Sequence, residues 1–180
     1  MKIQGQFLWI NIIGGIAVLG GYVYALLAHP ILRGQIWGGV PEAWRPWITT
    51  SMFIAAIGYC FAMYYLIFNE GLNLKYFWGK VDATIMRVLL ILFLLSAAFW
   101  IHSTFSYLEL PNSNSWHLIR FELWVTALSI LLMTIGLATA TGVQQSLLFN
   151  FSVLGLGLIS FHCLVFDAIL WISKFPRSEF

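Results

Sequence analysis

Long runs without charged residues dominate the chain. No Asp, Glu, Lys or Arg interrupts residues 3–32, 46–69, 88–108 or 123–166. A transmembrane helix needs about 20 mostly apolar residues to cross about 30 Å of hydrocarbon, so each of the first three runs is long enough for one crossing. The fourth run is too long for one span, and its segment ATATGVQQS, at 138–146, is typical of a turn. The pattern therefore predicts five spans.

These spans are predicted to be helices, at about residues 7–28, 48–68, 86–108, 118–139 and 147–171. Strands of a membrane barrel would alternate apolar and polar residues over about ten positions. Runs such as VLLILFLLSAAFW do not alternate. The first span is too long for a typical signal peptide and lacks a clean small-x-small cleavage site, so we retain it as a helix. The expected fold class is an all-α, polytopic membrane bundle, with residues 1–180 forming a single transmembrane domain.

Composition supports this class of protein. Hydrophobic residues make up 61% of the chain, charged residues make up 9%, and the mean hydropathy is +0.86. This balance is far from that of soluble domains. We therefore expect an integral, multi-pass membrane protein whose immediate partner is the lipid bilayer. Other membrane subunits, or further copies of the same chain, are additional expected partners, and nucleic acid is not.

Five crossings place the two ends of the chain on opposite faces of the membrane. We call the face of the amino terminus side A and the other face side B. Side A then has four Lys or Arg residues and side B has five, so the positive-inside rule favours neither orientation. Most acidic residues and all four histidines lie toward side B. Side B is therefore the face on which we expect chemistry.

Two ionisable residues inside the predicted spans call for an explanation. Glu122 lies in the fourth span, where an ionised group costs several kcal/mol unless it is paired or hydrated. His162 lies in the fifth span, and the common outcome for such a histidine is a neutral imidazole hydrogen-bonded to a neighbouring helix. Cys163 and Asp167 follow it, four residues apart and so on one helical face.

These residues predict a polar, aromatic-rimmed vestibule on side B that binds a small amphipathic or heterocyclic ligand. The short turn LPNSNS between the third and fourth spans should bring His102 and Glu122 to similar depths on adjacent helices. The predicted lining consists of His102, Glu122, His162 and Asp167. The residues predicted at the mouth are His117, Trp44 and Trp116. Tryptophan is also typical of the membrane interface, which accounts for most of the nine in this chain.

Other functions remain open at this stage. His102 and His162 could hold a haem axially, or a metal ion with a carboxylate as third ligand, although no HxxxH, ExxH or CxxC spacing fixes such a site. An enzyme acting on lipids could use His102 and Glu122 for proton transfer. A further hypothesis is a non-catalytic accessory or scaffold subunit. Its packing surface would be the small-residue stripe of the first span, Gly14, Ala17, Gly21 and Ala25.

Overall fold

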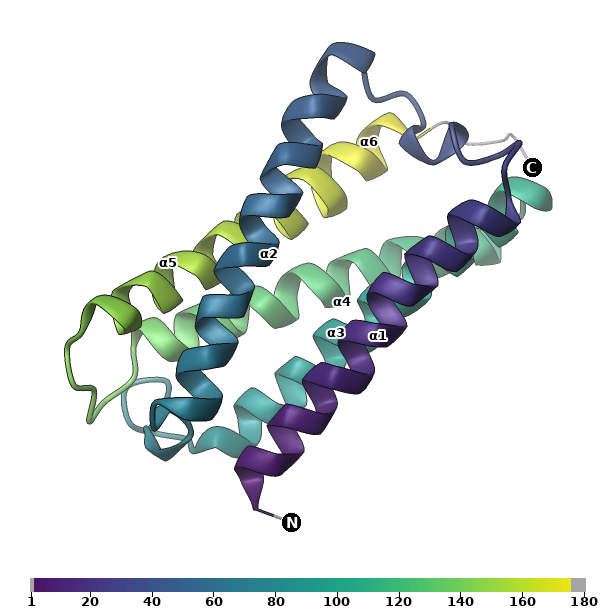
Figure 1. The fold of residues 1–180 in the computed structure, drawn as a ribbon. Coiled ribbons are helices and arrows are strands. Elements are labelled where there is room, and N and C mark those ends of the chain that lie inside the picture. The colour runs from purple at the N-terminus through teal and green to yellow at the C-terminus, as the bar shows by residue number, and fades with distance from the viewer. Residues whose placement is uncertain (1, 176–180) are drawn as a thin grey trace.

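The computed structural model describes residues 2–175 and shows an all-α bundle (Figure 1). Three long helices begin the chain: α1 (Ile3–Ala28), α2 (Arg45–Phe68) and α3 (Ala83–Glu109). They are followed by α4 (Ser113–Ala138) and by α5 (Leu147–Phe161), which continues through η4 (His162–Trp171) into α6 (Ile172–Lys174). All five resulting rods are long and apolar enough to cross a membrane. The predicted all-α fold class is therefore confirmed, with the predicted number of long apolar helices.

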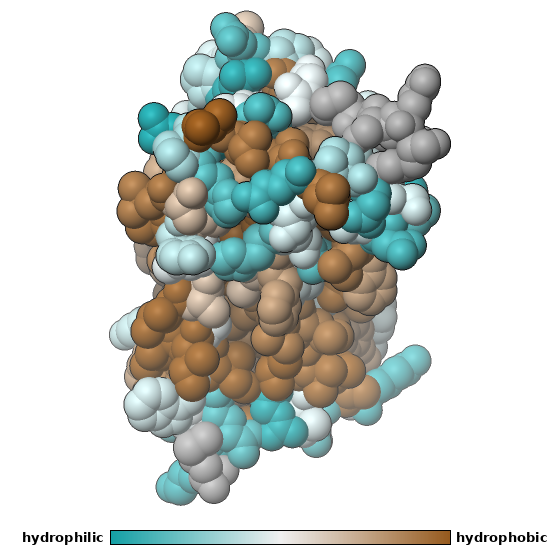
Figure 2. Space-filling model, turned by 90° about the vertical axis from the view of Figure 1, so that its right-hand side faces the viewer, coloured by the Kyte–Doolittle hydropathy of each residue, from teal (hydrophilic) through white to brown (hydrophobic). Residues whose placement is uncertain are grey.

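Short helical turns occupy the connections between the rods. η1 (Gln35–Trp37) and η2 (Glu42–Trp44) lie between α1 and α2, and η3 (Gly71–Asn73) follows α2. The first residues of α1 and the helix α6 lie at opposite ends of the bundle (Figure 1). On the face shown in Figure 2, hydrophobic side chains gather in a band between more hydrophilic ends, as expected for a protein surrounded by lipid.

The starts of α3 and α4 differ from the predicted boundaries because polar caps extend these two helices. α4 begins at Ser113 instead of about 118, and its cap Asn112 accepts a hydrogen bond from the Ser115 N–H over 2.9 Å. At the start of α3, Asp82 accepts a hydrogen bond from the Thr84 N–H over 2.8 Å, which lowers the pKa of this carboxyl below its usual value. The early start of α4 places Glu122 nine residues into the helix, deeper than the sequence analysis expected.

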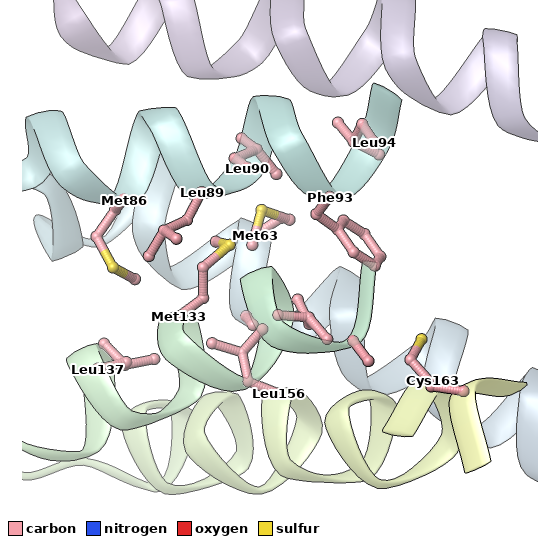
Figure 3. Packing of buried hydrophobic residues seen from close by; sticks show 14 of the residues in the cluster. Met63, Met86, Leu89, Leu90, Phe93, Leu94, Met133, Leu137, Leu156 and Cys163 are labelled. Atoms are coloured by element: carbon pink, nitrogen blue, oxygen red, sulfur yellow. The ribbon is translucent and has the colours of Figure 1, made fainter. Parts of the chain in front are cut away.

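The buried core joins α2, α3, α4 and α5 through long, flexible side chains (Figure 3). Met86, Leu90, Met133, Leu137 and Leu156 have no exposed surface. Methionine adapts its shape to irregular gaps, which suits a core between helices that cross at different angles. In contrast, α1 packs mainly against α3 and leaves most of its surface to lipid.

Glycines set the closest helix contacts. A Cβ atom on Gly155 of α5 would lie 2.2 Å from the carbonyl oxygen of Gly58 on α2, so the two backbones touch at this crossing. On α1, a Cβ atom at Gly14 would lie 2.6 Å from the Leu94 side chain of α3. Ala25 is fully buried against α3 as well. Gly14 and Ala25 of the small-residue stripe therefore pack against α3 of the same chain, whereas Ala17 stays exposed.

The end of α1 on side B is held by contacts of His29 with α3. His29 Nδ1 lies 3.0 Å from a carboxylate oxygen of Glu109, and the imidazole stacks on Phe105 with ring centroids 4.5 Å apart. Since Glu109 and Phe105 both belong to α3, these contacts fix the last turn of α1 to the last turns of α3.

The Gly58–Gly155 crossing gives a direct test of the fold. Gly155→Ala should lower the free energy of unfolding by about 1–3 kcal/mol, because the added methyl group forces α2 and α5 apart. The matched control is Gly157→Ala in the same helix, where a Cβ atom meets nothing within 4 Å. Unfolding in detergent, followed by circular dichroism, should show a loss only for Gly155→Ala. Equal stability of the two variants would contradict the close crossing.

Candidate functional site

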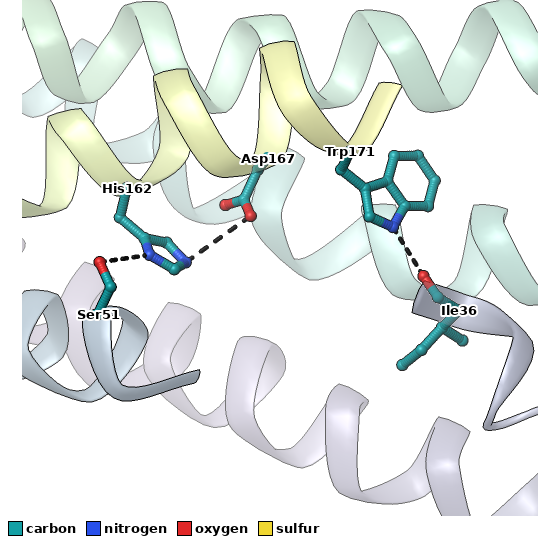
Figure 4. A network of polar contacts seen from close by, with 5 residues as sticks. All are labelled: Ile36, Ser51, His162, Asp167 and Trp171. Carbon is teal, nitrogen blue, oxygen red and sulfur yellow. Dashed lines mark hydrogen bonds and ion pairs between the residues drawn. The ribbon is translucent and has the colours of Figure 1, made fainter. Parts of the chain in front are cut away.

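The fifth rod changes its hydrogen-bonding pattern within the membrane span. Residues His162–Trp171 form the π-helical segment η4, in which hydrogen bonds run from residue i to i+5. Five residues advance about 140° around an α-helix, so His162 and Asp167 would point in different directions there. In η4 they lie on one face, with His162 Nε2 and Asp167 Oδ1 3.7 Å apart (Figure 4). π-Helical turns are frequent at functional sites.

Four polar side chains meet at this segment, and we call Ser51, His162, Cys163 and Asp167 the η4 cluster. His162 Nδ1 lies 3.1 Å from the Ser51 hydroxyl on α2. The Cys163 thiol lies beside the Asp167 carboxyl group, close enough for the two side chains to interact. The His162 side chain is buried, whereas 34% of the Asp167 side chain is exposed. The cluster therefore combines a fixed imidazole with an accessible carboxyl group.

Aromatic residues stand next to the η4 cluster. Trp171 donates from its indole N–H to the Ile36 carbonyl over 2.7 Å, which ties η4 to the turn after α1 (Figure 4). Its ring centroid lies 5.5 Å from that of Trp100 on α3, and Trp100 lies 5.8 Å from Tyr22 on α1. Tyr22 also lies near Asp167. Three helices thus contribute to the surroundings of Asp167.

Trp116 completes this aromatic group instead of standing at an open mouth. It is 4% exposed, and its ring centroid lies 6.2 Å from that of Trp171 and 5.7 Å from that of Tyr107. Phe175 stacks on it with centroids 5.7 Å apart. Within residues 2–175, the buried indole N–H groups of Trp100 and Trp116 have no hydrogen-bond acceptor. Aromatic packing therefore fills the interior on side B around Trp116.

Glu122 belongs to a separate polar seam between α3 and α4. One of its carboxyl oxygens accepts a hydrogen bond from the Ser103 hydroxyl over 2.9 Å, and the residue is 7% exposed. Its other carboxyl oxygen has no partner within residues 2–175. Thr126 lies one turn further along α4, and its hydroxyl is 2.7 Å from that of Ser96 on α3. Glu122 is therefore partly satisfied by α3 and stays away from lipid.

The remaining predicted residues lie apart from these clusters. His102 is exposed and lies against α1, where a Cβ atom on Gly21 would be 3.1 Å from its Nε2 atom. The His102 ring centroid lies 6.3 Å from that of Tyr24 on α1. His117 is exposed at the start of α4, and Trp44 is 47% exposed. Of the predicted lining, only His162 and Asp167 come into direct contact.

The proposed histidine pair does not form a local ligand set. His102 contacts α1, whereas His162 contacts α2 and the η4 carboxyl group. Among the residues that the structure describes, no group of three or more His, Cys, Asp and Glu side chains could hold a metal ion. The haem or metal hypothesis therefore gains no support from the arrangement of these side chains.

Ser51 of the η4 cluster, and its neighbours Tyr22 and Trp100, were not among the residues predicted from the sequence. Ser51 lies near the start of α2 with no motif to single it out, and Tyr22 and Trp100 had no assigned role. The spacing of five residues between His162 and Asp167 gave no signal, because it separates two side chains in an α-helix. A spacing rule that allowed a π-helical turn would have grouped His162, Asp167 and Trp171.

A double-mutant cycle tests the Glu122 seam. Ser103→Ala should lower the free energy of unfolding by about 1–3 kcal/mol, because it leaves a buried carboxyl group with no donor. In a Glu122→Leu background the same substitution should have almost no effect, because that carboxyl group is gone. The free energies can be measured by denaturant titration in mixed micelles. An equal loss in both backgrounds would show that Ser103 does not act through Glu122.

Comparisons with known proteins were made at three levels. No protein-family model matches the chain. No curated protein and no solved structure matches it either. The class of the protein therefore rests on its own architecture: a bundle of five helices that are long and apolar enough to span a membrane, with a buried aromatic group at one end.

Proposed function

We propose that this protein binds a small amphipathic amine, or a heterocycle with an N–H group, at the η4 cluster. The observation that carries the proposal is the Asp167 carboxyl group. It lies in a helical rod long and apolar enough to span a membrane, 34% of its side chain is exposed, and within residues 2–175 the only basic nitrogen within 4 Å of its carboxyl oxygens is His162 Nε2. Ionisable groups inside membrane segments are expensive to keep and commonly mark binding or transport sites.

The chemistry of the η4 cluster favours a ligand that donates hydrogen bonds. An Asp167 carboxylate accepts hydrogen bonds from an ammonium or N–H group, and such charge-assisted bonds are stronger than neutral ones. Ser51 orients the His162 imidazole, whose Nε2 atom faces Asp167. Asp167 lies between His162 and Trp171 along η4 (Figure 4). Aromatic rings stabilise organic cations through their faces, so the adjacent Trp171 and Trp100 favour an amine.

The depth of Asp167 favours an amphipathic ligand. It lies seven residues before Lys174, the last residue of α6, and therefore about 10 Å from the side B end of the rod. A polar head bound at this depth leaves an attached apolar group close to hydrocarbon, where burial is favourable. A purely hydrophilic ligand would lose its hydration there without such a gain.

The competing hypothesis of an accessory subunit has lost one of its supports. The small-residue stripe of α1 was its expected docking surface, but Gly14 and Ala25 pack against α3 of the same chain. Ala17 is the exposed member of the stripe, so a helix of another subunit would meet only part of it. We therefore favour ligand binding.

Binding of 2-phenylethylamine, compared with the neutral 2-phenylethanol, tests the proposal. The wild-type protein in lipid nanodiscs should bind the amine at least tenfold more tightly than the alcohol. Asp167→Asn should weaken amine binding by about 10- to 100-fold, because one charge-assisted hydrogen bond is lost. Saturation-transfer NMR measures both affinities.

Two controls make the result specific to Asp167. Glu42→Gln changes another acidic residue on side B, one with an 89% exposed side chain, and should leave amine binding unchanged. Thermal unfolding should show that Asp167→Asn remains folded. Equal binding of amine and alcohol, or unchanged amine binding by Asp167→Asn, would contradict the proposed function.

A further inference from the structure

A groove runs along the outer surface between α1 and α3, away from the η4 cluster. Its volume is about 540 Å³, within the range of small-molecule sites, which is about 300–1,000 Å³. Ile13, Leu94 and Ala98 are among the apolar residues that line most of it. The polar residues of the lining, Gln6 and Arg87, lie at its side A end. The groove therefore has an apolar body and one cationic end.

The length of the groove matches one leaflet of a bilayer. Its lining extends from Gln6 to Ala17 on α1 and from Arg87 to Ala98 on α3. Each stretch advances eleven residues, or about 16 Å at 1.5 Å per residue, close to half of the 30 Å hydrocarbon core. An extended acyl chain that starts at headgroup depth on side A would therefore reach the middle of the membrane within the groove.

Charge at the side A end favours an anionic headgroup. Arg87 is partly buried, donates a hydrogen bond to Gln6, and has no carboxylate within 4 Å in residues 2–175. Asp82 acts on it from a greater distance and is fully solvated. A guanidinium group binds phosphate oxygens with two parallel hydrogen bonds. Four cations, Lys2, Lys75, Lys80 and Arg87, outnumber the two acidic residues on this side, Glu70 and Asp82.

From these observations we propose that the α1–α3 groove holds one acyl chain of an anionic phospholipid, with its phosphate bound by Arg87. Gly14 and Ala17 keep the groove open, because residues this small leave space on the α1 side of it. The nearby Trp9, 53% exposed, lies one turn from Gln6 at the depth where indole rings contact headgroups. The lipid would join α1 to α3 where α1 has few other protein contacts.

Native mass spectrometry tests this site on the whole protein in mixed vesicles of phosphatidylcholine and phosphatidylglycerol. The wild type should retain one phosphatidylglycerol in preference to phosphatidylcholine. Arg87→Gln should reduce that preference about fivefold, as expected when one cation near the membrane surface is removed. Ala98→Leu, which fills the apolar body, should reduce retention of both lipids.

Matched controls separate a specific site from general attraction. Lys80→Gln removes an exposed side A cation outside the groove and should leave the preference unchanged. Arg87→Lys keeps the positive charge and should retain most of the preference for phosphatidylglycerol. Soluble glycerol 3-phosphate at the lipid's concentration should not displace the lipid, because it has no acyl chain.

Several outcomes would overturn the proposal. An unchanged preference in Arg87→Gln, or an equal loss in Lys80→Gln, would show that Arg87 is not a specific phosphate ligand. Displacement by glycerol 3-phosphate would show that the acyl chain is not held. If the wild type instead has the mass of a dimer without bound lipid, and Ala98→Leu has the mass of a monomer, the groove receives a second copy of the chain.

Discussion

Hydrogen bonds between helices are the constraint on which this bundle depends, because a polar side chain in hydrocarbon has no water to bind. Several helix pairs have such a contact. Thr134 and Ser160 join α4 to α5 with hydroxyl groups 2.7 Å apart, and Tyr59 of α2 donates to Asn11 of α1. Ser152 of α5 donates to the Phe61 carbonyl of α2 over 3.2 Å. The apolar surfaces of these helices could pack in many ways. The hydrogen bonds fix how each helix is rotated about its own axis relative to its neighbours.

Small residues make those contacts reachable. Where Gly58 meets Gly155, the backbones of α2 and α5 touch, and the Ser152 hydroxyl can reach a backbone carbonyl on the neighbouring helix. Dispersion forces over such close contacts hold helices together in lipid, where the hydrophobic effect between helices is absent. The bundle therefore combines glycine crossings with short polar bonds, and each depends on the geometry that the other sets.

The two ends of the bundle have different chemical character. Near side B, a carboxyl group, an imidazole and several aromatic rings meet in the interior around η4. Near side A, the distinctive feature lies on the outer surface, where an apolar groove ends at Arg87. An interior polar cluster suits a ligand with a hydrogen-bonding head, whereas a surface groove of one leaflet's length suits a lipid. The two proposals rest on separate residues and can be tested independently.

The sequence by itself determined the class of the protein, the number of spans and the residues that stand out as polar within them. These depend on local quantities: the length of apolar runs, the absence of charge and the polar turn around Gly142. The start of α4 was placed too late because its first turn, SNSWH, is polar and helical only through the Asn112 cap.

Only the tertiary structure decided which polar residues meet. His102 and Glu122 lie at related depths, yet His102 lies against α1 and Glu122 receives its hydrogen bond from Ser103. His162 and Asp167 come together because η4 departs from α-helical periodicity, on which sequence spacing arguments rely. Helix rotation and helix type arise from contacts between distant segments, so they could not be read from the local pattern of residues.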